Sequence, residues 1–228
     1  NFKDVLNVLG MYPGDPGPLG GECAGTIVAV GEGVEGLHAG DRVVALASGA
    51  FRSHTTCEAA FVAPLPASLS FADGAGLLIA HVTAEFALRH LGRLQAGERV
   101  LIHAAAGGVG LAAVALAQRV GAEVYATAGS EAKRDHLRSL GVRHVYDSRS
   151  LTFAGQIMAD AGAEGVDVVL NSLAGEFVPA SLGLLRDNGR FLEIGKRDHL
   201  AAERVAELGH EVAYHVIDWS ESTRTEPQ

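Results

Sequence analysis

The sequence predicts an α/β protein in which a doubly wound parallel sheet follows a partial β-barrel. The first 75 or so residues hold short β-branched runs that are separated by glycine and proline turns, the pattern of a small antiparallel barrel. Beyond them, six apolar runs alternate with helical segments, which is typical of a parallel sheet with helices on both faces. One of these runs leads through small residues directly into a helix, as in a loop that binds phosphate groups.

Composition narrows the class further. With 228 residues and 48% hydrophobic content, the chain is long enough for one large domain or two small ones. No uncharged apolar run reaches 18 residues, so we expect no membrane span, and a net charge of −9 without a basic patch argues against nucleic-acid binding. Cys23 and Cys57 form no C-x-x-C pair, and we expect two reduced thiols in a cytoplasmic protein rather than a disulfide.

Both ends look like cuts within a longer chain, because Asn1 begins in the middle of a pattern and the last residues are polar. We expect residues 1–78 to form part of a substrate-binding barrel whose first strands are missing. Residues 79–218 would bind a dinucleotide, and residues 219–228 would lead back to the barrel.

Each element follows from local pattern. In the first part we expect a short helix and three strands, at Asp4 to Leu9, Thr26 to Val30, Arg42 to Leu46 and Ala59 to Ala63. In the second part we expect six strands, at Arg99 to Ile102, Glu123 to Thr127, His144 to Tyr146, Val166 to Leu170, Arg190 to Ile194 and Val212 to Ile217. The predicted helices run from Thr83 to His90, from Leu111 to Arg119, from Ser130 to Ser139, from Leu151 to Ala161, from Ala180 to Arg186 and from Leu200 to Leu208.

The loop after the first of these six strands predicts a dinucleotide site. Aligned to G-x-G-x-x-G, its key positions are Ala105, Gly107 and Gly110, with Gly108 and Val109 between them. Small residues there let the backbone N–H groups approach a pyrophosphate, and the helix N-terminus adds partial positive charge. The strand before the loop and the helix after it make the match more specific than the glycines alone.

The end of the second strand indicates which nucleotide binds. Enzymes that use NAD usually carry an acidic residue there to hold the ribose 2′-hydroxyl. Here the strand runs into Gly129 and Ser130, and Lys133 and Arg134 follow. A hydroxyl and two cations attract a 2′-phosphate, so we predict NADPH; the alternative is that both cations are ordinary solvated helix residues.

A zinc-dependent alcohol dehydrogenase is the obvious rival for this combination of domains. It needs Cys and His ligands around an open metal position, and the sequence offers only His54, Cys57 and Glu58 in close succession. Three such residues within five positions are more consistent with chance, so we predict no metal.

The sequence resembles the enoyl reductase domain of modular polyketide synthases, a zinc-free branch of the medium-chain dehydrogenases/reductases that is related to the fatty acid synthase enoyl reductase. Zinc-dependent relatives carry His where this chain has Gly21. The matching stretches include Asn1 to Leu6, Leu9 to Gly14, Gly20 to Gly25, His103 to Gly110, Asp147 to Arg149, Gly165 to Leu173 and Gly189 to Lys196.

The resemblance implies a Rossmann domain after a GroES-like partial β-barrel. It also implies reduction of the α,β-double bond of an enoyl thioester carried by an acyl carrier protein. Lys196 would donate a proton or stabilise the developing charge, Asp218 would orient Lys196, and Tyr12 would relate to the configuration of an α-methyl branch. It adds Arg149, Asn171, Ser172, Leu173 and Gly195 to the cofactor-binding residues.

The implied partners are the acyl carrier protein and the ketoreductase and dehydratase domains of the same synthase. Two other functions compete with this prediction. One is a stand-alone NADPH-dependent quinone oxidoreductase with the same fold, and the other is a scaffold domain that has lost its activity.

Overall fold

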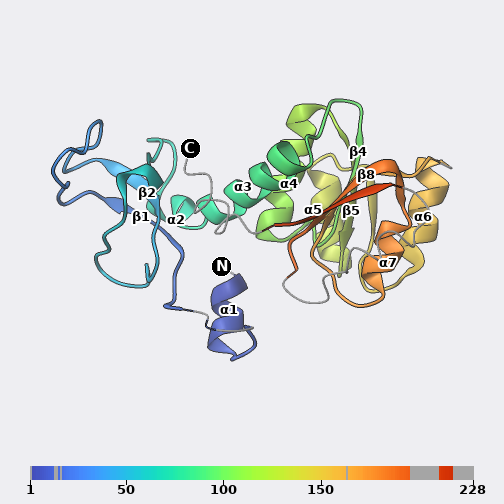
Figure 1. The fold of residues 1–228 in the computed structure, drawn as a ribbon, viewed down its shortest axis with the longest axis horizontal. Helices are drawn as coiled ribbons and strands as arrows, with labels where there is room; N and C mark the ends of the chain where they lie inside the picture. Colours follow the sequence, from blue (N-terminus) through green and yellow to red (C-terminus); the bar gives the residue numbers. More distant parts are fainter. Residues whose placement is uncertain (1, 13–14, 16, 163, 196–210, 218–228) are drawn as a thin grey trace. The chain divides into compact units, whose positions relative to one another are not determined.

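The structure is a computed structural model that describes residues 2–12, 15, 17–162, 164–195 and 211–217. The chain divides into two compact units, Asn1–Val82 and Thr83–Gln228 (Figure 1). Within the described residues, no helix combines the length and the apolar character needed to cross a bilayer.

The first unit is built on a three-stranded antiparallel sheet in the order β1-β2-β3. Its elements are α1 (Phe2–Val8), β1 (Glu22–Thr26), β2 (Arg42–Leu46), the 3-10 turn η1 (Ala59–Phe61), β3 (Val62–Pro64), α2 (Phe71–Gly74) and α3 (Leu78–Glu85), which continues into the second unit. The pairing of β1 with β2 runs from Glu22 opposite Leu46 to Thr26 opposite Arg42.

Two predicted strands of this unit were misplaced. The run from Thr26 to Val30 is predicted to be a strand, but the pairing with β2 ends at Thr26 opposite Arg42. Ile27 still exchanges backbone hydrogen bonds with Gly40 and Asp41. Val28 is 70% exposed, because β-propensity does not make a strand without a partner. The run from Ala59 starts as a 3-10 turn and becomes a strand only at Val62.

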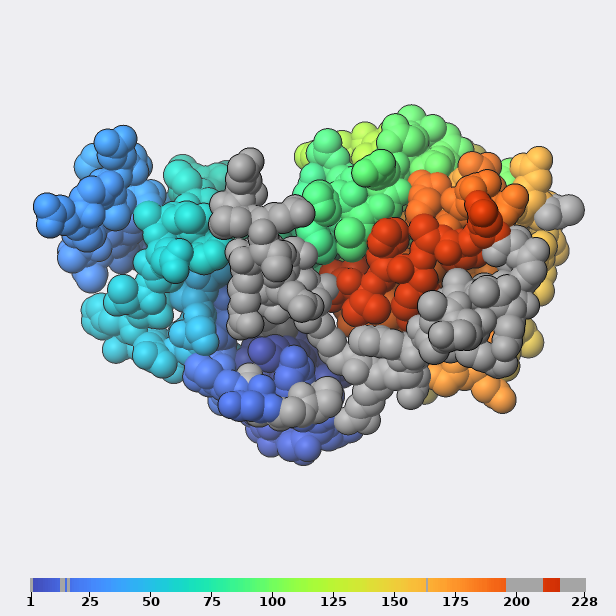
Figure 2. All heavy atoms as spheres, in the orientation of Figure 1, coloured from blue at the N-terminus to red at the C-terminus, as the bar shows by residue number. Residues whose placement is uncertain are grey.

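The second unit is a six-stranded parallel sheet in the order β6-β5-β4-β7-β8-β9. The predicted doubly wound sheet is therefore confirmed. Its strands are β4 (Arg99–Ile102), β5 (Glu123–Ala128), β6 (His144–Asp147), β7 (Val166–Asn171), β8 (Leu185–Glu193) and β9 (Val212–Val216). β9 is an edge strand, and Figure 2 shows it in red at the surface of this unit.

Helices cover both faces of this sheet (Figure 1). They are the π-helix η2 (Phe86–Leu91), α4 (Gly108–Val120), α5 (Glu131–Ser139), α6 (Thr152–Ala161) and α7 (Phe177–Leu182). An apolar cluster joins α6 and α7 to β4, β5, β7 and β8 around Phe153, Ile157 and Phe191, all fully buried. β7 is buried along its whole length, as a central strand covered on both faces must be.

Most predicted boundaries agree with these elements, but two helices differ. The helix predicted from Thr83 to His90 begins at Leu78 as α3 and continues from Phe86 as the π-helix η2. α7 begins at Phe177 rather than at Ala180, and Leu185 and Arg186 already belong to β8. The helix expected from Leu200 to Leu208 lies outside the described residues. α4 ends at Val120, and its C-cap residue Gly121 has a φ of 86°, a left-handed conformation that glycine adopts at little cost.

Candidate cofactor-binding edge

The expected cofactor-binding residues all lie at one edge of the parallel sheet. Each follows the carboxyl end of a strand or begins the helix after it: the glycine loop after β4, Gly129 and Ser130 after β5, Arg149 after β6, Ser172 and Leu173 after β7, and Gly195 after β8. The strand order reverses between β4 and β7, since β5 lies on one side of β4 and β7 on the other. Ligands of open α/β sheets bind outside the carboxyl ends of the strands at such a switch point.

Close backbone packing shapes the glycine loop. A Cβ on Gly110 would lie 2.5 Å from the Ala104 carbonyl oxygen and 2.6 Å from Ala105 Cα, so only glycine fits at this position without a backbone shift. Ala105 itself is fully buried, and its N–H donates to the Thr127 carbonyl at 2.9 Å. The loop therefore leads into the N-terminus of α4 with Gly107 as the N-cap residue, which presents free N–H groups to an anion.

A buried histidine, His103, lies between the end of β4 and the glycine loop. His103 is 3% exposed, and its Nδ1 and Nε2 lie 2.9 Å from Thr127 Oγ1 and 2.8 Å from Ser181 Oγ. Because the Ser181 hydroxyl donates to the Phe177 carbonyl at 2.6 Å, it must accept from His103 Nε2–H, and the Thr127 hydroxyl then donates to Nδ1. Burial lowers the pKa of His103 to about 3, so the ring is neutral and links β4, β5 and α7.

The residues expected near a 2′-phosphate lie together at the ends of β5 and β6. Ser130 is the N-cap of α5, and its Oγ accepts from the Lys133 N–H at 3.4 Å. The Arg149 side chain lies over Gly129, where a Cβ would come within 3.0 Å of the guanidinium Nε. Gly129 thus leaves room for Arg149 beside the strand end.

Arg134 is engaged within the protein itself. Its guanidinium donates to the Ala128 carbonyl at 3.0 Å and to Glu131 at 2.6 Å, and it lies 3.4 Å from Asp147. With only 15% of its side chain exposed, it ties α5 to the ends of β5 and β6. These contacts give Arg134 the geometry of a residue that fixes the loop, whereas Lys133 and Arg149 are exposed cations beside it.

A second hydrogen-bonded group joins the ends of β7 and β8. The Asn171 amide is hydrogen-bonded in both directions to the Leu173 backbone, accepting from its N–H at 3.1 Å and donating to its carbonyl at 2.8 Å. Asn171 also donates to Glu193 Oε2 at 2.7 Å, and the Gly195 N–H donates to Glu193 Oε1 at 2.6 Å. Glu193 was not among the expected site residues, although an acid inside an apolar strand is a signal that the sequence does carry.

Of the three expected catalytic residues, the structure describes only Tyr12. Lys196 and Asp218 lie outside the described residues. Tyr12 is half-buried in the first unit, where Lys3 Nζ lies 5.1 Å from the centre of its ring.

Zinc-dependent relatives of this architecture would need a cluster of metal ligands in the first unit. Within the described part of the chain, no three His, Cys, Asp or Glu side chains converge as metal ligands. Burial raises the pKa of Cys23 and of Cys57, so both are thiols at neutral pH.

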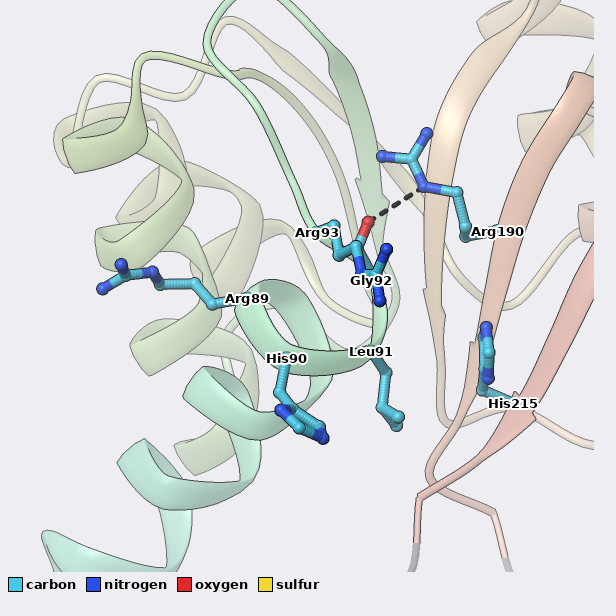
Figure 3. A pocket seen from close by; sticks show the side chains of 7 residues that line it. All are labelled: Arg89, His90, Leu91, Gly92, Arg93, Arg190 and His215. Carbon is cyan, nitrogen blue, oxygen red and sulfur yellow. Dashed lines mark hydrogen bonds between the residues drawn. The ribbon is translucent and has the colours of Figure 1, made fainter.

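A cavity of about 660 Å³ lies elsewhere in the second unit, between η2 and the face of β8 and β9 (Figure 3). Its lining includes Arg93, Arg190 and His215. Arg190 donates to the Gly92 carbonyl at 2.9 Å and to both carboxylate oxygens of Glu98. None of the expected cofactor-binding residues lines this cavity.

Comparison with known proteins places this architecture in a family. Residues 1–67 match the alcohol dehydrogenase GroES-like domain, and residues 108–224 match the zinc-binding dehydrogenase family. The chain is 44% identical over its whole length to a phenolphthiocerol/phthiocerol polyketide synthase of Mycobacterium tuberculosis, of which it spans 11%. It is 50% identical, over 97% of its length, to a pikromycin polyketide synthase component of Streptomyces venezuelae, of which it spans 6%.

Solved structures agree with this placement. The crystal structure of CurK enoyl reductase matches with a TM-score of 0.94 and 45% identity, over 100% of this chain and 72% of that one. Mycobacterial Rv1454c complexed with NADPH matches with a TM-score of 0.87 and 28% identity, over 98% of this chain and 72% of that one. The chain therefore belongs to the medium-chain dehydrogenase/reductase superfamily, as a member of the enoyl reductase domains of polyketide synthases.

Proposed function

We propose that the chain is an NADPH-dependent enoyl reductase that reduces the α,β-double bond of an enoyl thioester on an acyl carrier protein. The observation that carries the proposal is the carboxyl edge of the parallel sheet. The glycine loop, the cations near Gly129 and the residues after β7 and β8 all lie there, on both sides of the switch point. The similarity to CurK enoyl reductase supports the same reaction.

The edge fits NADPH in particular. The glycine loop and the N-terminus of α4 would hold the pyrophosphate, because the close approach of Gly110 to Ala104 leaves no side chain in the way. Ser130, Lys133 and Arg149 would hold the 2′-phosphate, with Arg134 fixing the loop that carries them. The NADPH found in the complex of Rv1454c supports this choice of nucleotide.

The chemistry needs a proton donor and stabilisation of negative charge. NADPH supplies a hydride to the β-carbon when it is bound. Lys196 then donates a proton at the α-carbon or stabilises the charge on the thioester oxygen, and Asp218 orients Lys196. Tyr12 contributes to the configuration of an α-methyl branch.

The relatives support a place for this chain within a larger synthase. The chain matches a segment of a much longer polyketide synthase. We propose that the acyl carrier protein delivers the substrate and that ketoreductase and dehydratase domains of the same synthase supply it, in the cytoplasm.

The test is turnover of a crotonyl thioester by the purified protein with NADPH and with NADH, followed by loss of NADPH absorbance. We expect reduction with NADPH to be faster. Reduction of a quinone but not of the thioester would favour the quinone oxidoreductase, and an absence of NADPH binding in a fluorescence titration would favour the scaffold.

Lys196→Ala tests the mechanism separately. We expect a lower turnover rate at an unchanged NADPH affinity, since Lys196 acts on the substrate. Circular dichroism serves as the control for folding, and an unchanged rate would remove Lys196 from the mechanism.

A further inference from the structure

Glu193 is a buried acid at the carboxyl end of β8. It is 1% exposed, and burying a carboxylate without partners is too costly to occur by accident. Its two oxygens accept from different loops, Oε2 from the Asn171 amide at 2.7 Å and Oε1 from the Gly195 N–H at 2.6 Å. Distances this short are typical of hydrogen bonds to an ionised acceptor.

Glu193 contacts the two loops that follow β7 and β8. Both strands lie on the same side of the switch point between β4 and β7. Asn171 is the last residue of β7, and both polar atoms of its side-chain amide are hydrogen-bonded to the backbone of Leu173. The backbone adds a further link between β7 and β8, from the Ile194 N–H to the Asn171 carbonyl at 2.9 Å. The Ile217 N–H, after β9, donates to the Glu193 carbonyl at 2.8 Å. Glu193 is therefore a side chain through which the ends of β7 and β8 are joined.

The chemistry of this junction requires two acceptors. Asn171 and Gly195 both present N–H donors to the Glu193 carboxylate. A glutamine of the same shape would turn an amide N–H₂ toward one of them, and the junction would lose one of these two hydrogen bonds. Gly195, which makes one of these bonds, directly precedes Lys196 in the sequence.

From this geometry we infer that Glu193 is a positioning residue for hydride transfer: it joins the loops after β7 and β8 and so sets the place of the nicotinamide. The inference rests on the proposed function. The inference concerns only the nicotinamide end of the site. The adenine end is expected at the ends of β5 and β6, whereas the Glu193 carboxylate accepts hydrogen bonds from Asn171 and Gly195, after β7 and β8.

The test compares Glu193→Gln with the matched control Glu98→Gln in the same protein. Glu98 is also a mostly buried acid that accepts a backbone N–H, from Gln95 at 2.8 Å, and side-chain N–H groups, from Arg190. It precedes β4 and so lies at the opposite, amino edge of the sheet. We expect Glu193→Gln to lower kcat about 10- to 100-fold, the loss that follows from one charge-assisted hydrogen bond and from misplaced reactants.

Two further readouts separate positioning from a merely structural role. Glu193→Gln should leave the Kd for adenosine 2′,5′-bisphosphate unchanged and should raise the primary isotope effect of deuterated NADPH. Glu98→Gln should lower the unfolding midpoint while kcat per folded molecule stays at the wild-type value. If Glu193→Gln lowers only the unfolding midpoint, with kcat per folded molecule and isotope effect unchanged, the inference is overturned.

The remaining outcomes are also decisive. Should Glu193→Gln fail to fold, Glu193→Asp keeps the charge but shortens the reach, and a kcat equal to wild type would overturn the inference. A wild-type protein that reduces no enoyl thioester refutes the proposed function instead. The inference about Glu193 is then tested by the fluorescence of bound NADPH, which Glu193→Gln must alter and Glu98→Gln must not.

Discussion

Gly110→Ala adds one methyl group where the glycine loop meets the first turn of α4. The new Cβ would lie 2.5 Å from the Ala104 carbonyl oxygen and 2.6 Å from Ala105 Cα, where ordinary contact begins at 3.4 Å. The overlap with the carbonyl is thus 3.4 − 2.5 = 0.9 Å. Both obstacles are backbone atoms, so the loop must move away from the helix. Overpacking of this kind costs about 1–3 kcal/mol.

The displaced backbone is the part that would hold the pyrophosphate. If the loop must return to its original place for NADPH to bind, the same cost appears in binding, and Kd rises about 5- to 150-fold. The assay is titration of the purified protein with NADPH, followed by nicotinamide fluorescence.

Gly155→Ala is the matched control. Gly155 lies in α6, and a Cβ there would have no neighbour within 4 Å. We expect this variant to gain about 0.5–1 kcal/mol of stability from helix propensity and to bind NADPH as the wild type does. A Gly110→Ala protein with the wild-type Kd would refute the reasoning about the loop.

Three further predictions concern charge. The folded pKa of His103 lies below its unfolded value, so the stability that the neutral ring contributes is present above about pH 6.5 and is lost as the pH falls toward 3. The free energy of unfolding should fall by about 1.4 kcal/mol per pH unit in this range. Denaturant midpoints measured against pH should show this slope, and His103→Gln should flatten it. Burial acts to raise the pKa of Glu98, but hydrogen bonds from Arg190 and the Gln95 N–H lower it overall, so Glu98→Gln should cost about 2 kcal/mol at neutral pH, and an unchanged midpoint would contradict the ion pair. Arg149→Ala should weaken NADPH binding by about 1–2 kcal/mol and leave NADH binding unchanged, so that equal losses for both nucleotides would argue against a 2′-phosphate contact.

Much of the second unit could be predicted from local pattern. The run from Arg99 to Ile102 is apolar and short, and the small residues after it predict both the turn and the start of α4. Ser130 predicts the start of α5 because its hydroxyl is a good N-cap, and the structure shows it in that role. All six predicted strands of this unit are found along the chain. Each could be predicted locally because turn residues bound it on both sides.

Elements that depend on a partner were harder to predict. The β-branched run after Thr26 has the composition of a strand, yet β1 lies before it, because the hydrogen bonds that define a strand come from β2. The partners of Arg134 were missed for a related reason. Its position in the sequence indicates a phosphate ligand, whereas its contacts with Glu131 and Asp147 arise only when α5 packs beside β6.

The sequence by itself determined the alternation of strands and helices, the glycine loop and the group of cations near it, since these depend on residues a few positions apart. Only the tertiary structure decided that His103 joins Thr127 to Ser181, which lies 78 residues after His103, and that Glu193 joins Asn171 to Gly195. Such contacts depend on which strands become neighbours in the sheet. Strand order is set by how all the buried faces fit together, and no short stretch of sequence carries that information.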